Sequence, residues 1–114
     1  MTERILKSLF DIKLAIDEIE SFLPDENLEL SDYKSNLLLK RAIERNFEII
    51  GEAMNRILNE DPDFPIPEAY RIVGLRNQII HGYDSVSDEN IWAIIINHLP
   101  GLKEKVHELT KDSE

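Results

Sequence analysis

Apolar residues recur at intervals of three and four over the first part of the chain, which is the spacing of one face of an α-helix. These positions are Ile5, Leu9, Ile12, Ile16, Ile19 and Leu23. Thr2 can cap the start of this helix, and Pro24 ends it because proline lacks the backbone donor and restricts the residue before it. The pattern therefore predicts a helix from Thr2 to about Leu23, followed by an acidic linker.

A second and longer helical pattern begins near Ser31 or Asp32 and continues to about Asn59, just before Asp61-Pro62 ends it. Few glycine or proline residues interrupt this stretch, so a single uninterrupted helix is expected. The apolar positions assigned to it are Leu38, Ala42, Phe47, Ile49, Ala53 and Ile57.

A third helix is predicted from Pro67 to His81, because the fixed φ of proline suits a first helical position and Gly82 is a natural stop. Ser87 is a good N-cap for a last helix that reaches about Leu109. Pro100-Gly101 should kink that helix or break it in two. The apolar positions of the third helix are Ala69, Ile72, Val73, Leu75, Ile79 and Ile80.

The order of elements predicts the fold class. No second strand-like segment is available to pair with the apolar run at residues 92–96, so a sheet is not expected. Four or five helices joined by short loops indicate an all-α, antiparallel four- to five-helix bundle. No internal repeat or composition shift divides residues 1–114, so we expect a single domain.

Charge and composition narrow the function classes. The chain carries 13 basic and 23 acidic residues, a net charge of −10 with histidine neutral, which argues against strong long-range attraction to nucleic acid. The basic residues are unevenly spread, however, and residues 69–83 hold Arg71, Arg76 and His81 with no carboxylate. The absence of cysteine excludes a disulfide framework and a thiolate site, and the N-terminus does not read as a signal peptide. We expect a soluble, cytoplasmic protein that does not enter a membrane.

A dedicated metal site is not expected. His81, His98 and His107 form no pair at a helical spacing, and Glu104-x-x-His107 is one copy of a motif that di-iron bundles need twice. A row of glutamates, Glu44, Glu48 and Glu52, lies among arginines, which indicates a salt-bridged surface. The three aromatic residues Tyr33, Tyr70 and Trp92 are interpreted as core or interface packing.

The segment from Gly74 to Asp84, GLRNQIIHGYD, is where chemistry could reside. A histidine can take the proton from a ribose 2′-hydroxyl as it attacks the adjacent phosphate, and an arginine can hold the charge that develops there. Asn77 and His81 share a helix face, so the amide could orient the imidazole. Arg76 and His81 are about 140° apart on a straight helix, so they converge only if the helix unwinds near Gly82 or two chains meet. The residue types alone also fit an Arg/His pair that caps helix carbonyls or binds an acid.

The stretch Arg76-Asn-Gln-Ile-Ile-His81-Gly-Tyr83 resembles the Arg-x4-His-x-Tyr motif of HepT-like toxins in the HEPN superfamily. The similarity extends over the chain, through the two long opening helices, the Val-Gly-Leu-Arg-Asn approach and the Ile-Trp…Leu-Pro-x-Leu closing helix. It implies a HEPN-like helical bundle and a metal-independent ribonuclease toxin of a type II toxin–antitoxin pair, with RNA as substrate.

The resemblance also implies roles for individual residues. Arg76 and His81 would be catalytic in a composite cleft of a homodimer, and Asn77 would support the pocket. Tyr83 matches the tyrosine that a minimal nucleotidyltransferase antitoxin (MntA-like) modifies with AMP. That partner would use ATP and Mg²⁺, whereas this chain would need no cofactor. The alternative is a non-catalytic helical module that docks to a nucleotidyltransferase and binds nucleotide.

Overall fold

The computed structural model describes residues 1–23, 27–81 and 86–113, and all regular structure within them is helical. The all-α bundle expected from the sequence is confirmed. Six α-helices and a terminal 3₁₀ turn follow one another: α1 Glu3–Phe22, α2 Leu30–Lys34, α3 Leu37–Glu60, α4 Ala69–His81, α5 Asp88–Asn97, α6 Leu99–Thr110 and η2 Lys111–Ser113.

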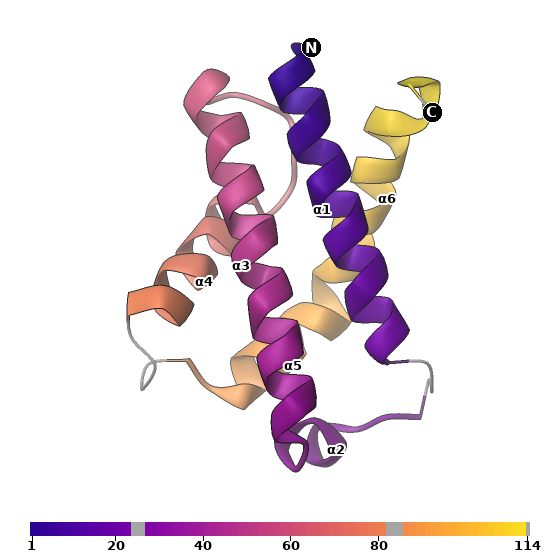
Figure 1. The fold of residues 1–114 in the computed structure, drawn as a ribbon, viewed down its shortest axis with the longest axis vertical. Helices are drawn as coiled ribbons and strands as arrows, with labels where there is room; N and C mark the ends of the chain where they lie inside the picture. The colour runs from indigo at the N-terminus through magenta and orange to yellow at the C-terminus, as the bar shows by residue number, and fades with distance from the viewer. Residues whose placement is uncertain (24–26, 82–85, 114) are drawn as a thin grey trace.

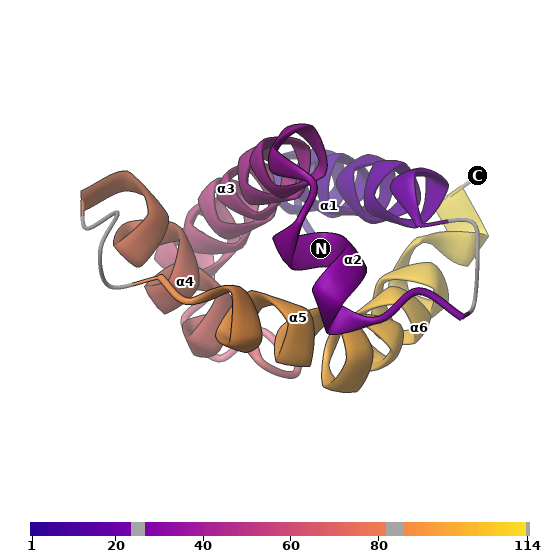
Figure 2. The ribbon, with the colours of Figure 1, turned by 90° about the horizontal axis from the view of Figure 1, so that it is seen from below.

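The long helices α1 and α3 run antiparallel and side by side (Figure 1). Seen from below, α1 and α3 lie along one side of the molecule, and α4, α5 and α6 lie along the other (Figure 2). The core lies between these two sides, and burial of each large apolar side chain there contributes about 1.5–3 kcal/mol. The face predicted for the first helix is confirmed at Ile5, Leu9, Ile12, Ile16 and Ile19, all of which are buried.

The buried face of α3 agrees with the predicted one only in part. The prediction is confirmed at Phe47, Ala53 and Ile57, which are buried together with Ile43, Ile50 and Met54. It is wrong at Leu38, which is 82% exposed, and at Ala42 and Ile49, which are only half-buried. The prediction erred because apolar residues occur on more than one face of this helix, and their spacing does not say which face meets α1.

The second predicted helix is divided in two. Residues 30–34 form the one-turn α2, and α3 starts anew after Asn36, whose backbone is extended (φ −116°, ψ 94°) and whose side chain accepts a hydrogen bond from the Leu39 amide at 3.0 Å. An asparagine that caps a new helix competes with its continuation. The break lets α2 turn toward α5, where buried Tyr33 packs on Trp92 with ring centroids 5.6 Å apart.

Two further helix boundaries differ from the prediction. The third helix starts at Ala69 rather than Pro67, because Glu68 has a φ of 64°, which a right-handed helix does not permit. The predicted break near Pro100 is confirmed, but it lies at His98, so that Pro100 falls in the first turn of α6, where its missing donor costs least.

The aromatic residues divide between core and surface. Tyr33 is fully buried and Trp92 packs against the core, so core packing is confirmed for these two. Tyr70 is 69% exposed on α4, so it is not a core residue, and packing at an interface stays a prediction for it. None of the helices described here has the length and apolar character needed to cross a membrane.

Candidate functional site

The helix that carries the Arg-x4-His motif, α4, is positioned by α3. Among the described helices, α3 alone approaches the backbone of α4 (Figures 1 and 2). The approach is closest at Gly51 on α3. A Cβ atom placed on Gly51 would lie 2.3 Å from the Arg76 Cβ, 2.8 Å from its Cγ and 3.2 Å from the carbonyl oxygen of Ile72. A residue with a side chain therefore does not fit here without moving α4.

Arg76 lies half-buried on α4, directly over Gly51. Its Nη1 donates a hydrogen bond of 2.9 Å to Oδ1 of Asn77. Its Nε is buried and has no hydrogen-bond partner among the described residues. The Nε side of the guanidinium is thus buried against the protein, and its Nη1 donates to a neutral amide. A buried, unpartnered donor is uncommon in folded proteins, and such groups often belong to functional sites.

The charges around Arg76 differ from those around most of the other cations. In the described part of the chain, at least nine lysine and arginine side chains form ion pairs with carboxylates: Lys7, Lys34, Lys40, Arg41, Arg45, Arg56, Arg71, Lys103 and Lys105. In the described part of the chain, no carboxylate pairs with Arg76, although 23 acidic residues are present in the sequence. Its charge is therefore available to a phosphate.

His81 is the last residue of α4, and its side chain is exposed. Because α4 remains helical through His81, the helix does not unwind between Arg76 and His81, and the two side chains leave α4 about 140° apart. No hydrogen bond between them occurs within the described residues. Asn77 is exposed, and its Oδ1 accepts a hydrogen bond from Arg76. Among the described residues no hydrogen bond joins Asn77 to His81, and its expected supporting role stays a prediction. Tyr83 lies outside the described residues.

The other candidate clusters have structural partners. Glu44 and Glu48 pair with Arg41 and Arg45 at 2.8 and 3.0 Å, as the salt-bridge interpretation predicted. His98 is partly exposed, and its Nδ1 lies 3.6 Å from a carboxylate oxygen of Glu68. No group of three or more potential metal ligands comes together among the residues that the structure places.

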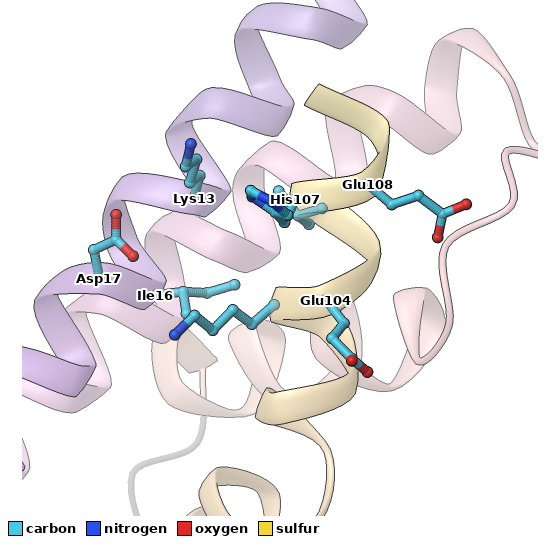
Figure 3. Close-up of a pocket in the computed structure, with 8 residues that line it drawn as sticks. Lys13, Ile16, Asp17, Glu104, His107 and Glu108 are labelled. Carbon is cyan, nitrogen blue, oxygen red and sulfur yellow. The ribbon is translucent and has the colours of Figure 1, made fainter. Parts of the chain in front are cut away.

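A groove of about 710 Å³ lies between α1 and α6, away from the motif (Figure 3). Lys13, Ile16 and Asp17 of α1 line it on one side, and His107 and Val106 of α6 line it on the other. Glu104 is also at its border, but its side chain points away from α1 (Figure 3). The groove is lined by acidic and basic side chains and one histidine, which together form neither a metal site nor an arrangement that would activate a nucleophile. The groove does not include Arg76 or His81.

The position of Gly51 inside a predicted long helix was a sign of its role that the helix prediction did not use. An isolated glycine inside a long helical pattern destabilises the helix, so its presence indicates a packing or functional reason. Its neighbour could not be identified from the sequence, because α3 and α4 meet only in the folded chain.

Comparisons with known proteins agree with the motif. The sequence model of the family described as "Ribonuclease HepT-like" matches residues 12–109. A protein of Methanocaldococcus jannaschii named "Putative RNase" is 30% identical over 119 aligned residues, which cover 100% of this chain and 94% of that protein. A "Probable ribonuclease HepT" of Thermococcus cleftensis is 35% identical over 109 residues, covering 90% of this chain and 93% of that protein. No solved structure matches the chain.

Proposed function

Because the chain belongs to the ribonuclease HepT-like family and is a ribonuclease, we propose that it is a metal-independent endoribonuclease that acts through Arg76 and His81. The observation that carries this proposal is the state of Arg76. It is the one cation of the motif helix α4 that has no carboxylate partner in the described chain, while its neighbour Arg71 pairs with Glu68. A guanidinium held by a neutral amide retains its charge for a substrate phosphate.

The reaction follows from the chemistry of the two side chains. The His81 imidazole takes the proton of a ribose 2′-hydroxyl, and the 2′-oxygen forms a bond to the adjacent phosphorus. The bond from phosphorus to the 5′-oxygen breaks, and a 2′,3′-cyclic phosphate remains. The leaving oxygen takes a proton from water, and the proton held by His81 neutralises the hydroxide that results. Arg76 stabilises the extra negative charge on the non-bridging oxygens during this step. Proton transfer of this kind contributes roughly 10²–10⁴-fold to the rate.

Cleavage of a fluorescent RNA by purified protein tests this assignment. Arg76→Ala and His81→Ala should each lower kcat by roughly 10²-fold or more, whereas Arg71→Ala, on the same helix, should retain activity. EDTA should leave the wild-type rate unchanged. Full cleavage by both variants would contradict the proposal and favour a non-catalytic module that binds nucleotide.

A homodimer would bring together groups that one α4 holds apart. Arg76 and His81 point in different directions from a continuous helix, so the proposed site needs Arg76 of one protomer and His81 of its partner. Ile80, which is 37% exposed between them, supplies apolar surface for such a contact.

Co-expression of the Arg76→Ala and His81→Ala variants tests the composite site. A mixed dimer would contain one site with both groups intact, so random pairing should restore about a quarter of the wild-type activity. If each protomer forms its own site, the mixture should remain as inactive as the single variants.

The proposed biological role is that of the toxin in a type II toxin–antitoxin pair, with a nucleotidyltransferase antitoxin as partner. Support comes from Tyr83, which follows His81 by two positions in the sequence. Transfer of AMP to its hydroxyl, with release of pyrophosphate from ATP, would add a negative phosphodiester and an adenosine near His81. Both would exclude the RNA phosphate, by charge and by volume.

The role of Tyr83 has a matched control within the chain. Tyr83→Phe should retain nuclease activity and resist the antitoxin with ATP and Mg²⁺, whereas Tyr70→Phe should be neutralised like the wild type, because Tyr70 is an exposed tyrosine on α4 outside the motif. Neutralisation and AMP labelling of Tyr83→Phe would exclude Tyr83 as the modified residue.

A further inference from the structure

We infer that Gly51 is a positioning residue of the nuclease site, which fixes the guanidinium of Arg76 by letting α4 lie directly on α3. The inference rests on the proposed role of Arg76. It adds a residue that lies outside the Arg-x4-His motif, 25 positions earlier in the chain and on another helix.

Of the three glycines that the structure describes, Gly51 alone makes such a close contact. A Cβ atom here would lie 2.3 Å from the Arg76 Cβ, whereas Cβ atoms placed on Gly74 in α4 or Gly101 in α6 would meet nothing within 4 Å. Glycine is unfavourable inside a helix, and Gly51 lies well inside the 24-residue α3. The close approach of Arg76 therefore accounts for a glycine that helix stability disfavours.

The displacement that a side chain would cause is large enough to matter for catalysis. Carbon atoms in ordinary contact are about 3.5–4.0 Å apart, so an alanine at Gly51 would push the Arg76 Cβ outward by more than about 1 Å. Because α3 is the described helix that approaches α4, the shift would move α4 as a whole. A misplacement of about 1 Å can cost roughly 10²-fold in rate.

The buried Nε of Arg76 is the second observation. This atom is shielded from solvent and has no partner among the described residues, while Nη1 donates to Asn77. The close packing on α3 thus covers one edge of the guanidinium and leaves the Nη end to meet a phosphate. Lifting Arg76 away from Gly51 would expose Nε and release this orientation.

Gly51→Ala tests the inference, with Gly74→Ala and Gly101→Ala as matched glycine controls. At a temperature where circular dichroism shows all three to be folded, Gly51→Ala should lose roughly 10²-fold in kcat with KM for RNA changed only a few-fold. Both controls should keep the wild-type kcat. The Nε–H signal of Arg76 in ¹H–¹⁵N spectra, assigned by its loss in Arg76→Lys, should exchange with solvent faster in Gly51→Ala.

A folded Gly51→Ala with wild-type kcat and an unchanged Nε–H signal would overturn the inference. If Gly51→Ala does not fold, the double variant Gly51→Ala/Arg76→Gly decides, because it removes the opposing Cβ. Recovery of folding supports the contact with Arg76, and continued failure overturns it. Failure of the proposed function is a separate outcome, because it would appear as undiminished cleavage by Arg76→Ala. In that case the exchange rate of the Arg76 Nε–H would still show whether Gly51 keeps this group buried.

Discussion

Arg76 and Asn77, adjacent on α4, are joined by a 2.9 Å hydrogen bond from the guanidinium Nη1 to the amide Oδ1. An amide at position 77 holds the arginine without neutralising it. A carboxylate there would have nearly the same shape but would pair with the guanidinium and repel the RNA phosphate.

Asn77→Asp should therefore lower kcat/KM for RNA by roughly 5-fold, because a close pair of charges at an exposed site is worth up to about 1 kcal/mol. Gln78→Glu adds the same charge at the next position of α4, also exposed, and is the control. Initial rates over a range of RNA concentrations measure both. Equal effects in the two variants would indicate general repulsion rather than capture of Arg76.

His81 should be required as the base that takes the proton of the ribose 2′-hydroxyl. His81→Gln should lower the rate of RNA cleavage by roughly 10²–10⁴-fold, because glutamine cannot accept that proton. His107→Gln, which changes an exposed histidine on α6, should preserve the rate. Initial rates of RNA cleavage measure both variants. A His81→Gln variant that cleaves as fast as the wild type would assign the base to another group.

Tyr33 should be replaceable by phenylalanine without loss of stability. Its hydroxyl is buried with no partner in the described structure, so removing that group leaves the Trp92 contact and takes away an unsatisfied donor. The free energy of unfolding of Tyr33→Phe, measured by urea denaturation, should equal that of the wild type or exceed it by up to about 1–2 kcal/mol. Tyr70→Phe, at an exposed site, should show little change. A clear loss of stability in Tyr33→Phe would reveal a partner for the hydroxyl.

Tyr33 also predicts a response to alkaline pH. Burial raises the pKa of the Tyr33 hydroxyl above its ordinary value. The unfolded chain loses this proton near pH 10 while the folded chain retains it, so the wild type should lose stability as the pH rises past about 10. Tyr33→Phe should lose less over the same range. Parallel curves for the two proteins would contradict this source of the effect.

The stabilisation that the Lys34–Glu89 ion pair gives to the contact between α2 and α5 should be lost at acid pH. Lys34 Nζ lies 2.7 Å from a Glu89 carboxylate oxygen, and this hydrogen bond lowers the pKa of Glu89 below its ordinary value. A lowered pKa stabilises the fold above the unfolded pKa, and the contribution disappears as the pH falls through the folded pKa. Glu89→Gln should therefore reduce Tm slightly at pH 7 and low salt.

The difference in Tm between wild type and Glu89→Gln should vanish at pH 2 and shrink in high salt, since both side chains are exposed. Asn90→Gln, at the next exposed position of α5, controls for a change of side chain without a change of charge. A difference that is independent of both pH and salt would point to helix propensity rather than to the ion pair.

Local rules predicted most of the helices because their signals lie within a few residues. Thr2 and Ser87 cap their helices through their side chains, as expected, at 3.2 and 3.1 Å. The errors arose where distant residues decide. From the sequence, Asn36 could either continue a helix or start a new one. In the structure it starts α3, and Tyr33 of the separate helix α2 packs on Trp92. Glu68 adopts a φ that no sequence signal marked.

The sequence by itself determined the helical composition, the α1 core face and the motif that identified the family, because these depend on spacing and residue type along the chain. Only the tertiary structure decided which face of α3 is buried and that Arg76 rests on Gly51, with its Nε covered and no carboxylate of the described residues paired with it. Such properties arise from helices that meet across long stretches of sequence, where the fit of neighbouring surfaces sets the positions of individual atoms.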